Sequence, residues 1–215
     1  LEYSKMYIET LIGNLKINEA FKYSKILQRK DFNYFESDLI IISKLIKNNN
    51  FNQLDKYFAS IKKDNYSSLQ ELLSQIIFSW ISVEKSKLNF NEAQEIFQLI
   101  NPKFKNIKKI NNVFLNCYFD TLNTEEKFQN LINDQNTDFS RYKFFYANYL
   151  IKKNLPEKAN LILTAKLKSV PINLLINQLY TDLKFKEQNY LQNSFNCKNI
   201  SNIIAELFYI TANAL

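Results

Sequence analysis

The residue types that perform most enzyme chemistry are scarce in this sequence, and they are not spaced for it. The chain has no histidine, which excludes Ser-His-Asp and Cys-His nucleophiles and any zinc site built from Cys and His. Its one glycine, Gly13, cannot supply a phosphate-cradling loop or a dinucleotide-binding fingerprint. We therefore expect a protein that is not an enzyme and that carries no cofactor and no metal.

Carboxylates and cysteines are the two remaining residue types that could take part in catalysis. Glu125 and Glu126 are sequence neighbours, so on a helix they point in different directions. At the start of a helix such residues favour the helix dipole, and this is the expected role of the pair. Cys117 and Cys197 lie far apart and form no CxxC motif, so the sequence predicts two free, buried thiols. Two cysteines do not decide the redox compartment.

The formal net charge of +7 could attract nucleic acid, anionic lipid or an acidic protein. Residues 141–146 mix aromatic and basic side chains that could stack on bases. The lysines of residues 103–109 could contact an acidic partner. A solvated, lysine-rich surface over an aromatic core explains residues 141–146 and the lysines of residues 103–109. The net charge is explained by a composition typical of AT-rich coding DNA, in which Lys is the default surface residue. Nucleic acid is therefore not the expected partner, and a basic solenoid that binds RNA remains an alternative.

Composition favours helices joined by short turns. Hydrophobic residues make up 46% of the chain, while it has 1 Gly and 3 Pro, which are the residues that sheet proteins need for turns and bulges. Asn tolerates the left-handed conformation that ends a helix, and residues 48–50 are all Asn. No apolar run approaches the roughly 20 residues that cross a bilayer, so we expect no membrane span.

A short phrase recurs along the chain: a polar turn, an apolar residue, an acidic or amide pair, and a residue that opens a second helix. The closing residues of the phrase are Ala20, Leu54, Ala93, Lys127 and Ala159, at intervals of 34, 39, 34 and 32 residues. Apolar residues at helical spacing precede and follow each phrase. An interval near 34 is the length of a tetratricopeptide repeat, which is one helix–turn–helix unit.

The small residue that closes three of the phrases has a physical purpose. A side chain no larger than a methyl group lets the second helix approach the first. Leu54 and Lys127 break this rule, so their hairpins should be splayed or packed in a shifted register. The longest interval predicts a longer first helix over residues 69–86, which contains Trp80.

These residues resemble a tetratricopeptide repeat protein. Ala20, Ala93 and Ala159 occupy the position where the tetratricopeptide consensus has a small residue in the second helix. Ala147 occupies the small-residue position of the first helix. The large residue near the end of the first helix is met at Leu11, Leu45, Tyr118 and Leu150. The consensus Gly of the hairpin turn is missing throughout. The resemblance implies an all-α fold, a right-handed α-solenoid of about five to six repeats.

The order of the units more narrowly resembles an uncharacterised bacterial family of long tetratricopeptide proteins. Its clues are Trp80 in the third unit, residues 145–150 followed by residues 156–159, and the closing residues 205–212. Such families act as protein-binding scaffolds, and this is the function that the resemblance implies. The alternative is a docking or regulatory arm of a larger enzyme or assembly factor.

We expect one array without separate domains. Its units should span residues 1–33, 34–66, 67–104, 105–137, 138–170, a degenerate unit 171–198, and the start of another unit at 199–215. The chain opens at Leu1 without an initiator Met and closes at Leu215 inside an apolar helical pattern, so we expect a piece of a longer protein that lacks its N-terminal targeting region. Its compartment could be cytoplasmic or periplasmic. From Ile172 to Leu183 the pattern predicts a helix, and from Lys184 to Lys198 a loose loop.

First helices of such repeats line a concave groove that can hold a peptide or protein partner. Alignment of the repeats makes Asn116 and Asn148 equivalent, and their amides could pair with the backbone of a bound peptide. The predicted partner-binding residues of this amide-lined, mildly basic groove are Glu36, Ser43, Lys47, Lys109, Asn112, Asn116, Arg141, Phe144, Asn148 and Lys152.

Overall fold

The computed structural model describes residues 2–32, 34–61, 66–164, 173–185 and 195–212. Within these ranges the fold is all-α, with helical repeat-like architecture and no strand. None of the described helices is both long and apolar enough to cross a membrane. The chain forms two compact units, Leu1–Leu88 and Asn89–Leu215, which are described separately below. Their boundary falls inside the expected third repeat, residues 67–104.

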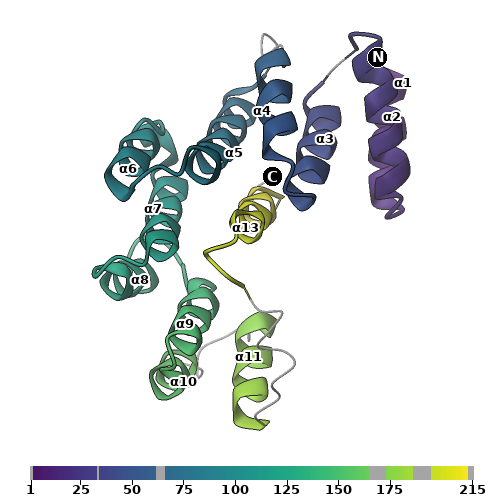
Figure 1. The fold of residues 1–215 in the computed structure, drawn as a ribbon. Helices are drawn as coiled ribbons and strands as arrows, with labels where there is room; N and C mark the ends of the chain where they lie inside the picture. Colours follow the sequence, from purple (N-terminus) through teal and green to yellow (C-terminus); the bar gives the residue numbers. More distant parts are fainter. Residues whose placement is uncertain (1, 33, 62–65, 165–172, 186–194, 213–215) are drawn as a thin grey trace. The chain divides into compact units, whose positions relative to one another are not determined.

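Unit 1 contains two complete helical hairpins and the first helix of a third (Figure 1). Each helix packs against the next one in the chain, and α1 also contacts α3. The predicted long helix over residues 69–86 is confirmed as α5. The helices of unit 1 are α1 (Glu2–Gly13), α2 (Ile17–Arg29), α3 (Phe35–Lys47), α4 (Phe51–Ser60) and α5 (Ser68–Ser86).

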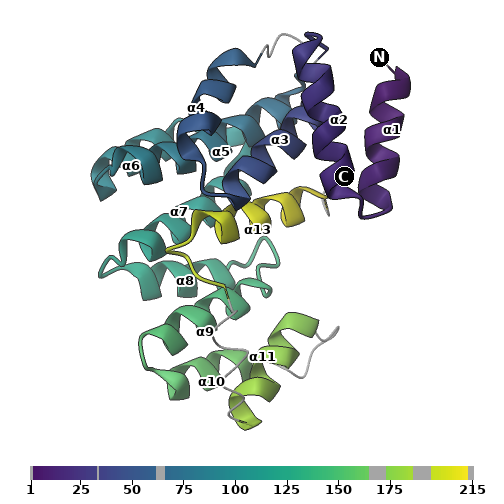
Figure 2. The same cartoon turned by 45° about the vertical axis from the view of Figure 1, so that its right-hand side comes forward.

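Unit 2 continues the pattern of consecutive packing, and α9 also contacts α11 (Figure 2). The predicted helix at residues 172–183 is present as α11, two residues later. Pro171, Ile172 and most of the predicted loop from Lys184 to Lys198 lie outside the described residues. The elements of unit 2 are α6 (Phe90–Gln98), the 3₁₀ turn η1 (Pro102–Phe104), α7 (Lys105–Phe119), α8 (Thr124–Ile132), α9 (Tyr142–Lys152), α10 (Pro156–Thr164), α11 (Leu174–Phe185) and α13 (Ile200–Ala212).

In the described residues, a left-handed residue follows each of the helices α1, α3, α5, α7 and α9, in the place of the missing glycine. The five residues are Leu15, Asn49, Lys87, Asp120 and Asn154, with φ between 51° and 59°. In four of the turns the following N–H donates to the carbonyl five residues before it, which satisfies an orphan carbonyl of the helix end. Those carbonyls belong to Leu11, Leu45, Asn116 and Leu150. The turn chemistry therefore recurs even where the side chains do not.

The opening turn of each second helix is buried where the sequence predicted close approach. Ala20, Ala93 and Ala159 are fully buried, and so is the larger Leu54. In α8 the fully buried residues are Thr124 and Phe128, whereas Lys127 between them is half-buried. Lys127 therefore does not fill the tight position that the alanines and Leu54 occupy, where its charge would be buried.

A buried carboxylate ties together three segments of unit 1. Asp38 of α3 is 1% exposed and accepts hydrogen bonds from the hydroxyl of Tyr57 at 2.5 Å and from that of Tyr66 at 2.7 Å. Tyr57 lies in α4, and Tyr66 precedes α5. Burial raises the pKa of Asp38, while the two hydroxyl donors oppose that rise. The carboxylate therefore carries a desolvation cost that these two donors offset in part.

Asp38→Ala should destabilise unit 1 by about 2–4 kcal/mol, because it leaves two tyrosine hydroxyls without their acceptor. Urea unfolding followed by the fluorescence of Trp80, which lies in α5, measures this loss. Asp55→Ala is the matched control in the same unit. It removes only an exposed ion pair with Lys85 and should cost under about 1 kcal/mol. Equal losses in the two variants would contradict the role given to Asp38.

Candidate protein-binding face

A segment from the end of the chain lies on the first helices of unit 2. Residues 195–212, here called the C-terminal segment, contact α7 and α9 through a disulfide, an ion pair and aromatic rings. In Figure 1, α13 lies on the side of α7 opposite α6 and α8. We define the α7/α9 face as Phe114, Cys117 and Tyr118 of α7 with Arg141 and Phe145 at the start of α9.

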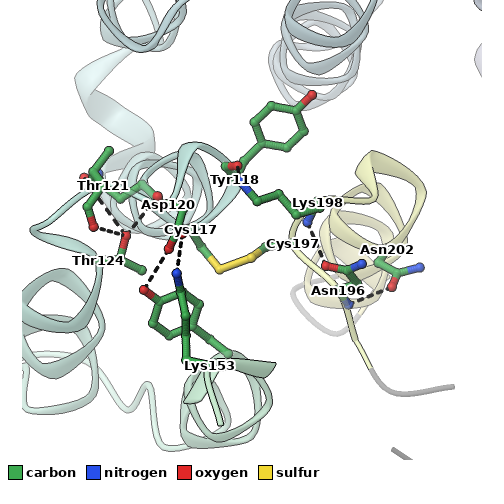
Figure 3. Close-up of a disulfide and its surroundings, with 12 residues drawn as sticks. Cys117, Tyr118, Asp120, Thr121, Thr124, Lys153, Asn196, Cys197, Lys198 and Asn202 are labelled. Atoms are coloured by element: carbon green, nitrogen blue, oxygen red, sulfur yellow. Dashed lines mark hydrogen bonds and ion pairs between the residues drawn. A yellow bond between two sulfur atoms is a disulfide. The ribbon is translucent and has the colours of Figure 1, made fainter. Parts of the chain in front are cut away.

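The disulfide joins Cys117 in α7 to Cys197, which is 80 positions later in the sequence, with 5.8 Å between their Cα atoms (Figure 3). The prediction of free thiols was wrong, although both side chains are buried as expected, at 1% and 7% exposure. Linear spacing carried no sign of the bond, because only the return of the chain onto α7 brings the sulfurs together. Next to the bond, the Lys198 ammonium donates to the carbonyl oxygen of Tyr118.

Arg141 holds the other end of the segment. Its guanidinium donates twice to Glu206 of α13, from Nε to Oε1 at 2.8 Å and from the terminal nitrogen to Oε2 at 2.7 Å. The guanidinium also lies 3.7 Å from the ring centroid of Tyr209, so it is stacked as well as paired. Burial opposes its charge, but the hydrogen bonds and the charge of Glu206 raise the pKa of Arg141. Burial and the same carboxylate raise the pKa of Tyr142.

Aromatic contacts fill the space between these two anchors. The ring of Phe195 meets Phe145 edge-on at 4.6 Å and lies 5.3 Å from the ring of Phe114. Pairs of this kind contribute roughly 0.5–1.5 kcal/mol each beyond their buried area. The apolar stripe of α13 is buried at Ile200, Ile203, Ile204 and Leu207. The segment therefore docks by apolar contact and is oriented by one charged pair.

Three of the predicted residues belong to this region, in different ways. Arg141 binds the C-terminal segment directly. Lys152 lines a cavity together with Phe195 and Cys197, and partial burial lowers its pKa. Phe144 is buried and packs edge-on against Phe145.

The predicted equivalence of Asn116 and Asn148 is wrong. The left-handed residues Asp120 and Asn154 set the true register, and in that register Asn116 matches Leu150. Asn116 accepts from the Thr121 hydroxyl at 2.7 Å, so its amide closes the α7–α8 turn. Asn148 is buried, and its amide nitrogen donates to the carbonyl of Phe144. The sequence alignment slipped because the α7–α8 turn is longer than the others.

The other predicted residues have the following surroundings within their own units. Lys109 pairs with Asp134, and Asn112 lines a cavity of about 410 Å³ with Lys109 and residues of α6. In unit 1, Glu36 forms a 3.0 Å ion pair with Lys5. Ser43 is half-buried and Lys47 is exposed on α3. The sequence analysis overlooked Phe114, Phe145, Glu206 and Cys197, since a groove predicted for another molecule gave no reason to include the end of the same chain.

Comparison with family models, with curated proteins and with solved structures finds no match to this chain. Among the described residues, no group of three or more Cys, Asp or Glu side chains is placed to hold a metal ion. The function must therefore be argued from the α7/α9 face itself.

The disulfide makes a direct prediction. Protein unfolded without reductant should show no reactive thiol, and reduced protein should show two. Replacing both cysteines with Ser should cost about 4 kcal/mol, because the bond closes an 80-residue loop in the unfolded chain. Thiol titration and urea unfolding followed by circular dichroism measure the two effects. Two reactive thiols in unreduced protein would contradict the bond.

The ion pair can be measured separately by a double-mutant cycle. Arg141→Ala, Glu206→Ala and the double variant should give a coupling energy of about 1–3 kcal/mol in urea unfolding, as expected for a bidentate, largely buried pair. The exposed pair Lys87–Glu84 provides the control cycle, with coupling under about 0.5 kcal/mol. A coupling near zero at Arg141 and Glu206 would mean that the pair does not orient the segment.

Proposed function

We propose that this chain is a non-catalytic scaffold for protein–protein interaction, and that the α7/α9 face binds a helical segment of its partner. The observation that carries the proposal is the docking of the C-terminal segment on this face. The segment lies far from α7 in sequence, yet it meets a prepared combination of aromatic rings and one oriented cation. Helix-in-groove recognition uses the same combination of apolar anchors and a polar contact that fixes orientation.

The architecture supports the same function. Helical hairpins stack on one another, and a left-handed turn recurs at intervals close to the tetratricopeptide length. We infer a right-handed α-solenoid of tetratricopeptide type, in which first helices carry the binding surface. Arrays of this kind present rigid, extended surfaces and need no catalytic group.

The RNA-binding alternative is weakened by burial. Of the aromatic rings at residues 141–146, those of Tyr142, Phe144, Phe145 and Tyr146 are all 7% exposed or less, so they are not available for stacking on bases. In the basic run, Lys108 donates to the carbonyl of Gln98, and Lys109 pairs with Asp134. Burial of the rings and these two lysine contacts therefore favour a protein partner over RNA. A role as the docking arm of a larger protein is compatible with the same binding face.

The test separates the segment from its covalent attachments. A protease recognition sequence is inserted between Tyr190 and Leu191, the protein is cleaved, and the disulfide is reduced. The released peptide, made with a fluorescent label, is then titrated back. We expect saturable binding with a Kd of about 1–100 μM, because the aromatic contacts and the ion pair survive without the covalent bond.

Arg141→Ala should weaken this binding at least tenfold, whereas Arg29→Ala, at an exposed position of unit 1, should leave it unchanged. Absence of saturable binding up to 1 mM peptide, with helicity of the cleaved protein intact by circular dichroism, would refute a helix-binding face. Equal affinities in the two Arg variants would show that the ion pair takes no part in recognition.

A further inference from the structure

A small cavity lies directly beside the disulfide. It has a volume of about 220 Å³ and is lined by both cysteines, by Asp120, and by three lysines, Lys152, Lys153 and Lys198. The lysines come from α9 and from the C-terminal segment, and Figure 3 shows Lys153 and Lys198 on opposite sides of the bond. Among the described residues, three lysines and one aspartate thus line the cavity beside the disulfide.

The charge of this cavity is only partly balanced within it. Asp120 pairs with Lys153, and this hydrogen bond, with the charge of Lys198 adding to it, lowers the pKa of the carboxyl group. Lys198 donates to a neutral carbonyl, that of Tyr118. Among the described residues, Lys152 has no carboxylate partner. An anion that entered the cavity would therefore meet a net positive field in a partly desolvated place.

Both cysteines line the cavity, and Cys197 is the more exposed residue of the two, at 7% against 1% for Cys117. We therefore take Cys197 as the residue that a thiol in the cavity attacks. Disulfides open by attack of a thiolate on one sulfur, and a positive surrounding stabilises both the attacking and the leaving thiolate. The cavity thus offers charge stabilisation at the position where such a reaction begins.

We propose that this cavity is a docking site for a small thiol that carries carboxylate groups, and that this thiol opens the Cys117–Cys197 bond to release the C-terminal segment. The second half rests on the proposed function, since release matters only if the α7/α9 face has another ligand. Neutral and cationic thiols should react more slowly, because they gain nothing from the lysines.

The exchange balances with two thiols. The first thiolate attacks Sγ of Cys197, forms a mixed disulfide there, and expels the Cys117 thiolate. A second thiolate attacks the mixed disulfide at the sulfur of the small thiol, which yields the oxidised small-molecule disulfide and the Cys197 thiolate. Two electrons pass from two thiols to the protein bond, and the protein thiolates take up protons from water. The segment loses its covalent link to α7 at the first step.

This chemistry makes occupancy of the face depend on the thiol pool. An oxidising compartment keeps the segment in place, whereas a reducing one removes its covalent anchor. After reduction, the C-terminal segment is held only by non-covalent contacts, among them the aromatic rings and the ion pair with Arg141. A partner helix can then compete for the α7/α9 face.

The test measures reduction of the full chain by mercaptoacetate, 2-mercaptoethanol and cysteamine, which are anionic, neutral and cationic. Each rate is divided by the rate of the same thiol with a short, unstructured disulfide peptide. At low salt the normalised rate should be at least about fivefold higher for mercaptoacetate than for cysteamine, and 0.5 M NaCl should reduce this preference.

Variants of the cavity lysine test where the preference comes from. Lys152→Gln should lower the preference for mercaptoacetate about two- to threefold, and Lys152→Glu should abolish or reverse it. Lys103→Gln, at an exposed position of η1, is the matched control. Equal normalised rates for the three thiols, or equal effects of the Lys103 and Lys152 variants, would overturn the docking site.

Release is measured on the same protein by amide hydrogen exchange of residues 196–212, which should become at least tenfold faster after reduction. Unchanged exchange would overturn the release step. Binding of a labelled peptide of residues 195–215 with Ser at position 197, tested on oxidised and reduced full chain, then examines the face. Faster exchange without any peptide binding would contradict the proposed function while the thiol site stands. If the peptide binds to the reduced chain and does not bind to the oxidised chain, the result supports both the thiol site and the proposed function.

Discussion

A helical hairpin of about 30 residues cannot hide its apolar stripe by itself, and this constraint governs both units. From α1 to α5 in unit 1 and from α6 to α11 in unit 2, each helix packs against the next helix in the chain, so stability there is built from contacts between neighbours. Most of the fully buried large side chains, among them Trp80, Phe114 and Phe128, lie within helices and are carried at helical spacing. The same local rule that builds the stack also leaves one side of the first helices without a sequential neighbour.

Close packing of the hairpins requires tight turns, and this chain makes them almost without glycine. A non-glycine residue in the left-handed region costs roughly 1–2 kcal/mol in sterics. Asn and Asp bear this cost most easily, yet Leu15 and Lys87 also adopt the conformation. The turn geometry therefore comes from helices that must fold back to bury their stripes, together with the hydrogen bond to the helix-end carbonyl.

The α7/α9 face shows what happens on the side of α7 and α9 that lacks a sequential partner. Phe114 and Phe145 would expose apolar area there, and residues 195–212 supply the missing cover. Apolar contact gives the association little direction, whereas a bidentate pair between Arg141 and Glu206 fixes one orientation. The disulfide adds a covalent limit on how far the segment can move from α7. Cover, orientation and attachment are thus separate physical contributions, and each can be removed without the others.

The local properties of the chain were determined by sequence alone. Helical periodicity located most of the helices, and the length of α5 was predicted from one long interval. These features depend on residues within a few turns of one another, so spacing is enough to infer them. The equivalence of Asn116 and Asn148 failed because one turn is longer, and the side-chain pattern alone does not show where a turn closes. The disulfide, the pairing of Arg141 with Glu206 and the cover of Phe114 were decided only by the tertiary structure. Each joins residues at least 65 positions apart, and no periodic pattern specifies which distant segment returns to which helix.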